Sequence, residues 1–352
     1  MKRITVYEPT VGAEELANLG EALAANELIR GRFVTRFEAQ IAEYVGVRFG
    51  VGTNSGTAAI HTALLIAGIA PGDEVLITTL TFIAPANAIA YCGAHPVFVD
   101  VTERDWQMDP DAARRFCEQD CRFDGKQLTN RATGRPVTAI VLVHFLGMPA
   151  DIEAFGALAR RYNLTLIEDA AQALGTRTKS RMVGGFGLIG CYSFYGNKLI
   201  TAAGGGMLVT DDPALAERAR YLINQAKDDP VETLHRSIGY NYRMTNIHGA
   251  IGCAQFDRIG DHVARKREIA TRYRETLSGQ PGITLPREPQ DQCWTLWLTC
   301  IRIDPDRFGL DARELLRELG EHGVETIPLY QPLHQSEAHK GAHRVGGRVA
   351  EM

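Results

Sequence analysis

The sequence predicts an α/β protein in which helices flank a mostly parallel central sheet, followed by a small C-terminal α+β domain. Short apolar runs and segments of helical periodicity alternate from residue 49 to residue 169, as in successive β-α-β units. Two of these runs, residues 138–144 and 164–169, are apolar almost throughout, as expected of strands covered on both faces. The 352 residues, of which 45% are hydrophobic, can form one large core and a smaller second one.

The individual elements follow from local spacing. One stripe of residues 33–44 carries Phe33, Phe37, Ile41 and Tyr44, which indicates a helix. The expected helices span residues 13–26, 33–44, 58–67, 84–91, 109–119, 152–162, 211–226, 247–256, 261–277 and 311–322. The expected strands span residues 49–53, 74–78, 96–101, 138–144, 164–169 and 294–303. We divide the chain near Gly260 into a large domain of residues 1–260 and a small domain of residues 261–352, whose last dozen residues look unpacked.

Composition and charge exclude several classes of protein. A formal net charge of -4 without a long basic run argues against a nucleic-acid or anionic-membrane surface. The first residues lack the apolar core of a signal peptide, and no apolar run reaches the roughly 20 residues that span a bilayer, so we expect a cytoplasmic protein. Seven scattered cysteines suit reduced thiols, and no cysteine or histidine set has the spacing of a metal site.

One lysine stands in a stretch without other charges. Residues 191–207 read CYSFYGNKLITAAGGGM, with Lys198 between an aromatic run and a glycine cluster. Burial of an ammonium favours the neutral amine, which attacks carbonyl groups and forms Schiff bases. The alternative is a lysine that reaches out to solvent from a strand edge, and this stretch alone leaves both interpretations open.

A second candidate feature is a turn that leads from a strand into a helix. Ser55, Gly56 and Thr57 stand where free main-chain N–H groups, the helix dipole and two hydroxyls would converge on a phosphate. The alternative is that Ser55 serves only as the N-cap of the helix, which is the more common role of a serine at that position.

A third feature is the carboxylate that ends the apolar strand at residues 164–169. Asp169 at the carboxyl edge of a buried strand needs a cationic partner, such as a protonated pyridine nitrogen, although it could also be a helix N-cap. Gln172 could bond a ring substituent or lie on the surface, and Phe82 could stack on a ring. A phosphate-binding turn, a carboxylate, an aromatic ring and an unpaired lysine together suit pyridoxal phosphate.

With these residues in place, the chain resembles the DegT-type nucleotide-sugar aminotransferases, within the fold-type I pyridoxal phosphate enzymes. The resemblance runs from about Gly31 to His334 and is nearly colinear. Its motifs are NSGTAAIHTALL, GDEVLITTLTFIAPANAI, GAHPVFVDV, VHFLGMPADI, LIEDAAQALG, SFYGNK, GYNYRMTNIHGAIG and YQPLH.

The resemblance implies a role for each candidate residue. In this family the lysine of the SFYGNK motif forms the Schiff base, and the acid and glutamine of the EDAAQA motif contact the ring. These residues are Lys198, Asp169 and Gln172. The family binds the cofactor phosphate through its SGT turn, the serine of its SF motif and an asparagine from the partner subunit. The corresponding residues are Ser55, Gly56, Thr57, Ser193 and Asn241, so the resemblance implies a homodimer with shared sites. Substrate contacts are expected at Tyr330 and His334 of the YQPLH motif.

The resemblance also suggests the substrates. The glycine-rich residues 202–206 and the YNYRMTN motif are similar to the branch that aminates UDP-2-acetamido-2,6-dideoxy-4-ketohexoses, with glutamate as donor, for surface polysaccharides. Alternatives are GDP-4-keto-6-deoxymannose, a dTDP-linked 4-keto or 3-keto sugar, and a non-catalytic regulator of the same fold. A dehydratase of this fold carries histidine in place of the lysine, so Lys198 argues against it. Relatives continue beyond the YQPLH motif, so we expect a truncated small domain.

Overall fold

The structure, a computed structural model, describes residues 3–229 and 231–352. Its strands are β1 (Phe49–Thr53), β2 (Glu74–Thr78), β3 (His95–Val99), β4 (Cys121–Phe123), β5 (Leu128–Asn130), β6 (Pro136–Val143), β7 (Thr165–Asp169), β8 (Arg177–Thr178), β9 (Arg181–Met182), β10 (Ile189–Ser193), β11 (Gly206–Thr210), β12 (Ile283–Thr284), β13 (Gln292–Cys293), β14 (Arg302–Ile303) and β15 (His343–Val345). Its α-helices are α1 (Ala13–Ala24), α2 (Arg32–Val45), α3 (Gly56–Ile66), α4 (Ala84–Tyr91), α5 (Pro110–Arg115), α6 (Ile152–Tyr162), α7 (Pro213–Ile223), α8 (Asn246–Asp257), α9 (Ile259–Leu277), α10 (Pro305–Phe308) and α11 (Ala312–Glu321).

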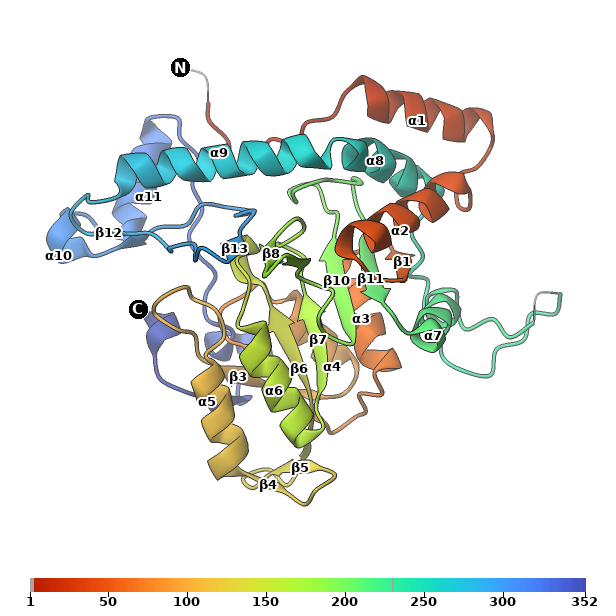
Figure 1. The fold of residues 1–352 in the computed structure, drawn as a ribbon, viewed down its shortest axis with the longest axis horizontal. Coiled ribbons are helices and arrows are strands. Elements are labelled where there is room, and N and C mark those ends of the chain that lie inside the picture. The colour runs from red at the N-terminus through yellow and green to blue at the C-terminus, as the bar shows by residue number, and fades with distance from the viewer. Residues whose placement is uncertain (1–2, 230) are drawn as a thin grey trace.

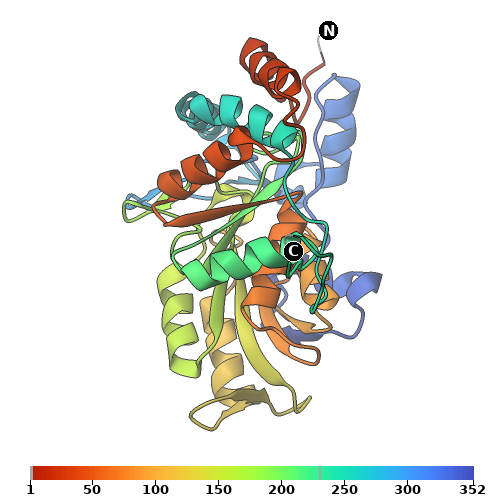
Figure 2. The same ribbon diagram turned by 90° about the vertical axis from the view of Figure 1, so that its right-hand side faces the viewer.

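A large sheet forms the centre of the molecule, with strand order β1-β11-β10-β7-β6-β2-β3-β15 (Figure 1). From β10 to β15 each strand is parallel to its neighbour, whereas β11 lies antiparallel between β1 and β10. Figure 2 shows helices on both sides of this sheet. The predicted α/β class and the mostly parallel sheet are therefore confirmed.

The sheet is buried on both faces because alternate side chains of its strands enter two different cores. In β6, Ile140 and Leu142 belong to the core that also contains side chains of α2, α5 and α6. Their neighbours Ala139 and Val141 belong to the core that contains side chains of α3, α4 and α7. This explains why the predicted strands at the middle of the sheet read as continuous apolar runs.

Five strands of the sheet, β4, β5, β10, β11 and β15, were not expected from the sequence. β10 and β11 are each five residues long, and glycines interrupt the first and begin the second, which weakens the strand pattern. Both are buried along almost their whole length. Residues 194–205, including Lys198, form the connection between these two neighbouring strands, so the predicted lysine lies at one end of the sheet.

The predicted strand at residues 294–303 is wrong. Its last two residues form β14 and β13 lies just before it, but its centre is irregular and packs against the large sheet region. The main-chain N–H of Thr295 donates to Thr176 Oγ1 at 3.1 Å, and that of Trp297 donates to the Leu146 carbonyl at 2.9 Å. Because these main-chain groups bond to loops, they are not available for a strand ladder.

The expectation that the last dozen residues are unpacked is also wrong. β15 pairs in parallel with β3 and forms an edge of the large sheet. Beyond it, the main-chain N–H groups of Val349 and Ala350 donate to the buried carboxylate of Asp100 at 2.9 and 3.0 Å. Val345 completes the attachment by accepting the Asp100 N–H at 2.9 Å.

The path from the large region to the smaller one is a helix. This helix is α9 (Figure 1). It is 19 residues long, and Gly260 lies in its first turn. After α9 the chain forms a small unit with the β12–β14 pair, α10 and α11. The domain division near residue 260 stays a prediction. Within the ranges described above, no helix combines the length and the apolar character that crossing a bilayer requires.

Candidate active site

Lys198 and Asp169 come together at the carboxyl ends of neighbouring parallel strands. Asp169 is the last residue of β7 and lies in register with Cys191 of β10. Lys198 follows β10 in the connection to β11, and its ammonium group interacts electrostatically with the Asp169 carboxylate. The carboxyl edge of a parallel sheet is where α/β proteins usually bind their ligands, so both residues lie where a cofactor site is expected.

The surroundings of Lys198 favour its neutral form. Burial lowers the pKa of Lys198 to about 8, and the Asp169 carboxylate acts against this shift. Its Nζ lies 4.3 Å from the centroid of the Trp297 ring, and no ion pair of Lys198 occurs within residues 3–229 and 231–352. An amine with a pKa near 8 is partly neutral at physiological pH and can attack a carbonyl carbon.

Asp169 is a buried carboxylate with an incomplete set of partners. It is 5% exposed, and its carboxylate accepts a hydrogen bond of 3.0 Å from the Ala171 N–H, the only hydrogen bond of this carboxylate to the described residues. Burial raises the pKa of Asp169, while the Ala171 N–H and the Lys198 ammonium act in the opposite direction. A cationic ligand group beside the carboxylate would stabilise its charged form, as a protonated pyridine nitrogen would. The residue therefore fits the ring of pyridoxal phosphate.

The predicted phosphate turn is formed by residues from two segments. Ser55 precedes α3, and its Oγ accepts the Ala58 N–H at 3.1 Å, so it is the N-cap of the helix. Gly56 lies against Ser193: a Cβ atom at residue 56 would approach Ser193 Cβ to 2.8 Å. Thr57 is half-buried beside them. The close approach of Gly56 to Ser193 leaves main-chain N–H groups and hydroxyls together at the N-terminus of α3.

The ring and substrate candidates also lie near one another. Phe82, which is 52% exposed, and Tyr330 have ring centroids 5.8 Å apart. Gln172 is buried, accepts the Leu146 N–H through Oε1 at 2.7 Å, and bonds to Tyr330. Burial raises the pKa of Tyr330 to about 12. The structure thus brings together Phe82, Gln172 and Tyr330, which lie far apart in the sequence.

His334, four residues after Tyr330, contacts Thr79, three residues before Phe82. Its Nδ1 is 2.6 Å from Thr79 Oγ1, and its Nε2 is 3.2 Å from Glu351 Oε1. The segment that follows β2 therefore holds the histidine at the site through Thr79. Glu351 comes from the C-terminal residues, which the sequence had not connected with the site.

Asn241 is the predicted cofactor residue that stands apart. Its side chain is exposed, while its main-chain carbonyl accepts a hydrogen bond of 3.0 Å from Asn54 Nδ2. The main chain of residue 241 is thereby fixed next to the turn at residue 55. An exposed side chain at this place is available to a second subunit, and its assignment to the partner's phosphate stays a prediction.

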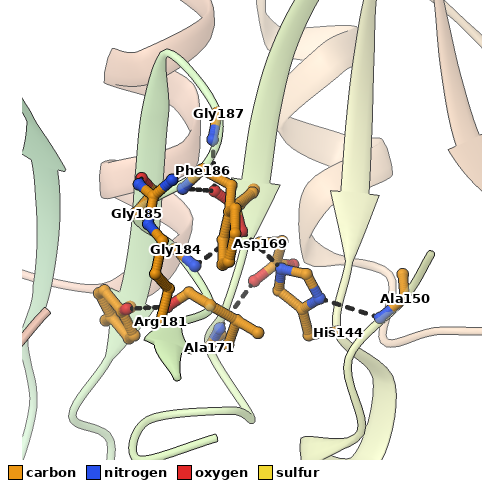
Figure 3. Close-up of polar contacts among 12 residues, drawn as sticks. His144, Ala150, Asp169, Ala171, Arg181, Gly184, Gly185, Phe186 and Gly187 are labelled. Carbon is orange, nitrogen blue, oxygen red and sulfur yellow. Dashed lines mark hydrogen bonds and ion pairs between the residues drawn. The ribbon is translucent and has the colours of Figure 1, made fainter. Parts of the chain in front are cut away.

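Two buried residues next to Asp169, a histidine and a glutamate, were not assigned a role from the sequence. His144 and Glu168 are both 0% exposed, and His144 Nε2 lies 2.9 Å from Glu168 Oε2. The Ala150 N–H donates to His144 Nδ1 at 3.1 Å, so the ring proton is on Nε2 and is donated to the carboxylate. Figure 3 shows this histidine between Ala150 and the end of β7.

Glu168 is also enclosed by main-chain donors. The N–H groups of Gly184, Phe186 and Gly187 donate to its carboxylate at 2.7, 2.7 and 2.6 Å (Figure 3). Burial acts to raise the pKa of Glu168, but the hydrogen bonds from His144 and the loop outweigh it and hold the pKa below its ordinary value. A carboxylate in a buried apolar strand requires such partners. The position of Glu168 in the strand at residues 164–169 was therefore the sequence signal that could have predicted this network.

This network predicts an effect of Glu168→Gln on stability. The substitution leaves one fewer acceptor for four buried donors, and we expect a loss of about 3 kcal/mol in the free energy of unfolding at pH 7. Because the folded-state pKa of Glu168 is lowered, its contribution is present above the ordinary value of 4.5 and is lost as the pH falls below it. Urea unfolding at pH 7 and pH 4 measures this, and an equal difference between wild type and variant at both values would contradict it.

Residues 9–350 match the DegT/DnrJ/EryC1/StrS aminotransferase family. This chain belongs to that family. The GDP-perosamine synthase of Escherichia coli O157:H7 is 38% identical over 335 residues, which cover 95% of this chain and 86% of that protein. The GDP-perosamine synthase of Caulobacter vibrioides is 34% identical over 336 residues, which cover 95% of this chain and 86% of that protein.

A solved structure agrees with the family membership. DesV of S. venezuelae, in complex with a ketimine intermediate, has a TM-score of 0.88 and 31% sequence identity to this chain. The match covers 100% of this chain and 91% of DesV. The predicted fold type is confirmed, and the DegT family member described here is a pyridoxal phosphate-dependent sugar aminotransferase of nucleotide-sugar biosynthesis.

Proposed function

We propose that this chain transfers an amino group from glutamate to a keto-sugar carried on a nucleotide diphosphate, for the synthesis of a surface polysaccharide. The observation that carries the proposal is the convergence of a lysine with a pKa of about 8 and a buried carboxylate without a full set of partners. When bound, pyridoxal phosphate supplies a carbonyl for amines and a ring that accepts electron density.

The proposed site residues would have the following roles toward the cofactor and the substrate. Lys198 would supply the amine that bonds to the cofactor carbonyl and, when free, would hold the proton that passes between a cofactor carbon and a substrate carbon. Asp169 keeps the ring nitrogen protonated, and Gln172 and Phe82 hold the ring. Ser55, Gly56, Thr57 and Ser193 bind the phosphate at the N-terminus of α3. Tyr330, whose ring lies next to Phe82, and His334, which bonds to Thr79, orient the substrate.

The relatives favour one of the alternative sugars over the UDP-linked sugar that the motifs suggested. Two relatives at 38% and 34% identity carry the name GDP-perosamine synthase. We therefore place GDP-4-keto-6-deoxymannose first among the acceptors and the UDP-2-acetamido-2,6-dideoxy-4-ketohexose second. The common requirement of both is a carbonyl on a sugar that a nucleotide diphosphate anchors.

A panel of keto-sugar nucleotides tests this order. Purified protein with pyridoxal phosphate and glutamate is incubated with the GDP-linked, UDP-linked and dTDP-linked keto-sugars, and amino-sugar products are measured by mass spectrometry. We expect the highest kcat/KM with the GDP-linked sugar. Preference for the UDP-linked sugar would restore the first choice of the sequence, and a position-3 product would overturn both.

The non-catalytic alternative is separated by a simpler measurement. An aminotransferase converts the yellow, lysine-bound cofactor into pyridoxamine phosphate when glutamate is added, so its visible absorbance falls. A regulator that only binds the cofactor keeps this absorbance. We expect bleaching within minutes at millimolar glutamate.

We further propose a homodimer in which Asn241 of one subunit contacts the cofactor phosphate of the other. Two inactive variants, Lys198→Ala and a disruptive substitution of Asn241, are dissociated together and allowed to reassociate. A mixed dimer has one site with both defects and one with neither. Half of the dimers are mixed, so about a quarter of wild-type activity should return.

The controls for this complementation are wild-type protein taken through the same treatment and proof that mixed dimers form. If the wild type recovers and mixed dimers are present without activity, the site lies within one chain and the shared-site proposal fails.

A further inference from the structure

Trp297, which the sequence did not indicate as a site residue, lies against Lys198. Its side chain is 2% exposed, and Lys198 Nζ is 4.3 Å from the centroid of its ring. Its indole N–H donates a hydrogen bond of 2.6 Å to the main-chain carbonyl of Asn197, the residue before Lys198. One side chain therefore contacts both the amine of the lysine and the main chain from which the lysine extends.

Trp297 is itself held from several directions. Its main-chain N–H donates to the Leu146 carbonyl at 2.9 Å, and its carbonyl accepts from Lys266 Nζ at 2.9 Å. Its ring stacks with Tyr7 at a centroid distance of 5.9 Å and an interplanar angle of 27°. The main chain of Trp297 packs closely against Gly147, because a Cβ atom at residue 147 would lie 2.8 Å from the main-chain nitrogen of Trp297. Because the Trp297 ring is fixed in this way, it can restrict the conformations of the flexible Lys198 side chain that contacts it.

From this geometry we propose that Trp297 is the positioning residue of Lys198 and holds its amine in place whenever the amine is not bonded to the cofactor. The inference rests on the proposed role of Lys198 as the attachment residue. A lysine side chain has several rotatable bonds and loses considerable freedom when its amine must meet a carbonyl. The face of a tryptophan attracts a desolvated ammonium, and the Asn197 hydrogen bond fixes the main chain beside it.

The chain beyond α9 thereby contributes to the site of Lys198. Trp297 comes from the segment 294–303, which leaves the small unit and packs against the large sheet region. Lys198 belongs to the connection between β10 and β11, whereas Trp297, which sets the position of its amine, comes from a distant segment of the chain. Both regions are then required for a competent lysine.

Two forms of the cofactor provide a test with a readout other than activity. Pyridoxal phosphate attaches covalently to the lysine and produces visible absorbance, whereas pyridoxamine phosphate has no carbonyl and binds without a bond to the lysine. The rate of attachment and the Kd of pyridoxamine phosphate are measured on cofactor-free protein. For Trp297→Leu we expect attachment to be about 10- to 100-fold slower, with the Kd of pyridoxamine phosphate changed by less than about twofold.

Two further variants serve as controls. Trp297→Phe keeps an aromatic face and loses the N–H, so its attachment rate should lie between those of wild type and Trp297→Leu. Trp294→Leu makes the same chemical change at a tryptophan that is equally buried in the same segment but bonds to Gln292 instead of Asn197. We expect its attachment rate to stay near that of wild type.

The outcomes are distinct. Attachment at the wild-type rate in Trp297→Leu, or an equal loss of attachment and of pyridoxamine phosphate affinity, overturns the inference. If Trp297→Leu does not fold, Trp297→Phe decides, because attachment at the wild-type rate in that variant also overturns it. A wild type that binds pyridoxal phosphate without attachment to Lys198 would instead refute the proposed function of the lysine.

Discussion

Lys198→Ala is expected to abolish covalent attachment of pyridoxal phosphate and to lower kcat by about 10⁴-fold. The substitution removes both the amine that attacks the cofactor carbonyl and the group that carries the proton between carbons. Borohydride reduction of the loaded protein, followed by peptide mass spectrometry, should locate the cofactor on Lys198 in the wild type. Turnover with glutamate and a GDP-linked keto-sugar measures the loss of activity.

The matched control is Lys266→Ala. Lys266 is the second lysine near the site, and burial lowers its pKa as well, but its Nζ bonds to the Trp297 carbonyl at 2.9 Å. Because Lys266→Ala leaves the amine of Lys198 in place, this variant should still carry the cofactor on residue 198, and the comparison concerns the site of attachment, not its rate. A borohydride-stable linkage that persists in Lys198→Ala would show that another lysine forms the bond.

Asp169→Asn is expected to lower turnover by about 10²- to 10³-fold while it changes cofactor affinity much less. The side chain keeps its shape and can still accept the Ala171 N–H through its amide oxygen, so the fold of this turn should be retained. The loss is the negative charge that keeps the ring nitrogen protonated. Single-turnover kinetics with glutamate separate the chemical step from binding.

Asp169→Glu offers a second comparison. It keeps the charge but moves the carboxylate by one methylene in a position that is 5% exposed. We expect it to retain more activity than Asp169→Asn if charge is the decisive property. Wild-type turnover in Asp169→Asn would mean that the carboxylate serves only to cap the turn after β7.

The sequence predicted β1, β2, β3, β6 and β7 of the central sheet, because these strands are short apolar runs that are buried along most of their length. Residues 138–144 and 164–169 became β6 and β7 with shifts of one or two residues at their ends. Lys198 and Asp169 could be identified because each conflicts with its apolar surroundings unless it has a partner. Their meeting at one sheet edge then follows from parallel pairing of neighbouring strands.

Other features depend on contacts between distant segments. The sequence around Trp294 and Trp297 has the aromatic character of a strand, and only Leu146, Thr176 and the α9 side chains decide that it is irregular. β10 and β11 were also missed, because Gly190 and Gly206 weaken the apolar pattern by which a buried strand is recognised. Trp297 could not be recognised as a neighbour of Lys198 because no local property of the sequence connects residues 198 and 297.

The pairing of β15 with β3 has a consequence for how the chain folds. His343 lies opposite Val97, so this edge of the sheet closes only after a very long loop has been ordered. Until then the outer side of β3 presents unpaired N–H and C=O groups to other chains. We therefore expect intermediates with an open β3 edge to accumulate during refolding and to associate at high protein concentration, with a refolding yield that falls as concentration rises.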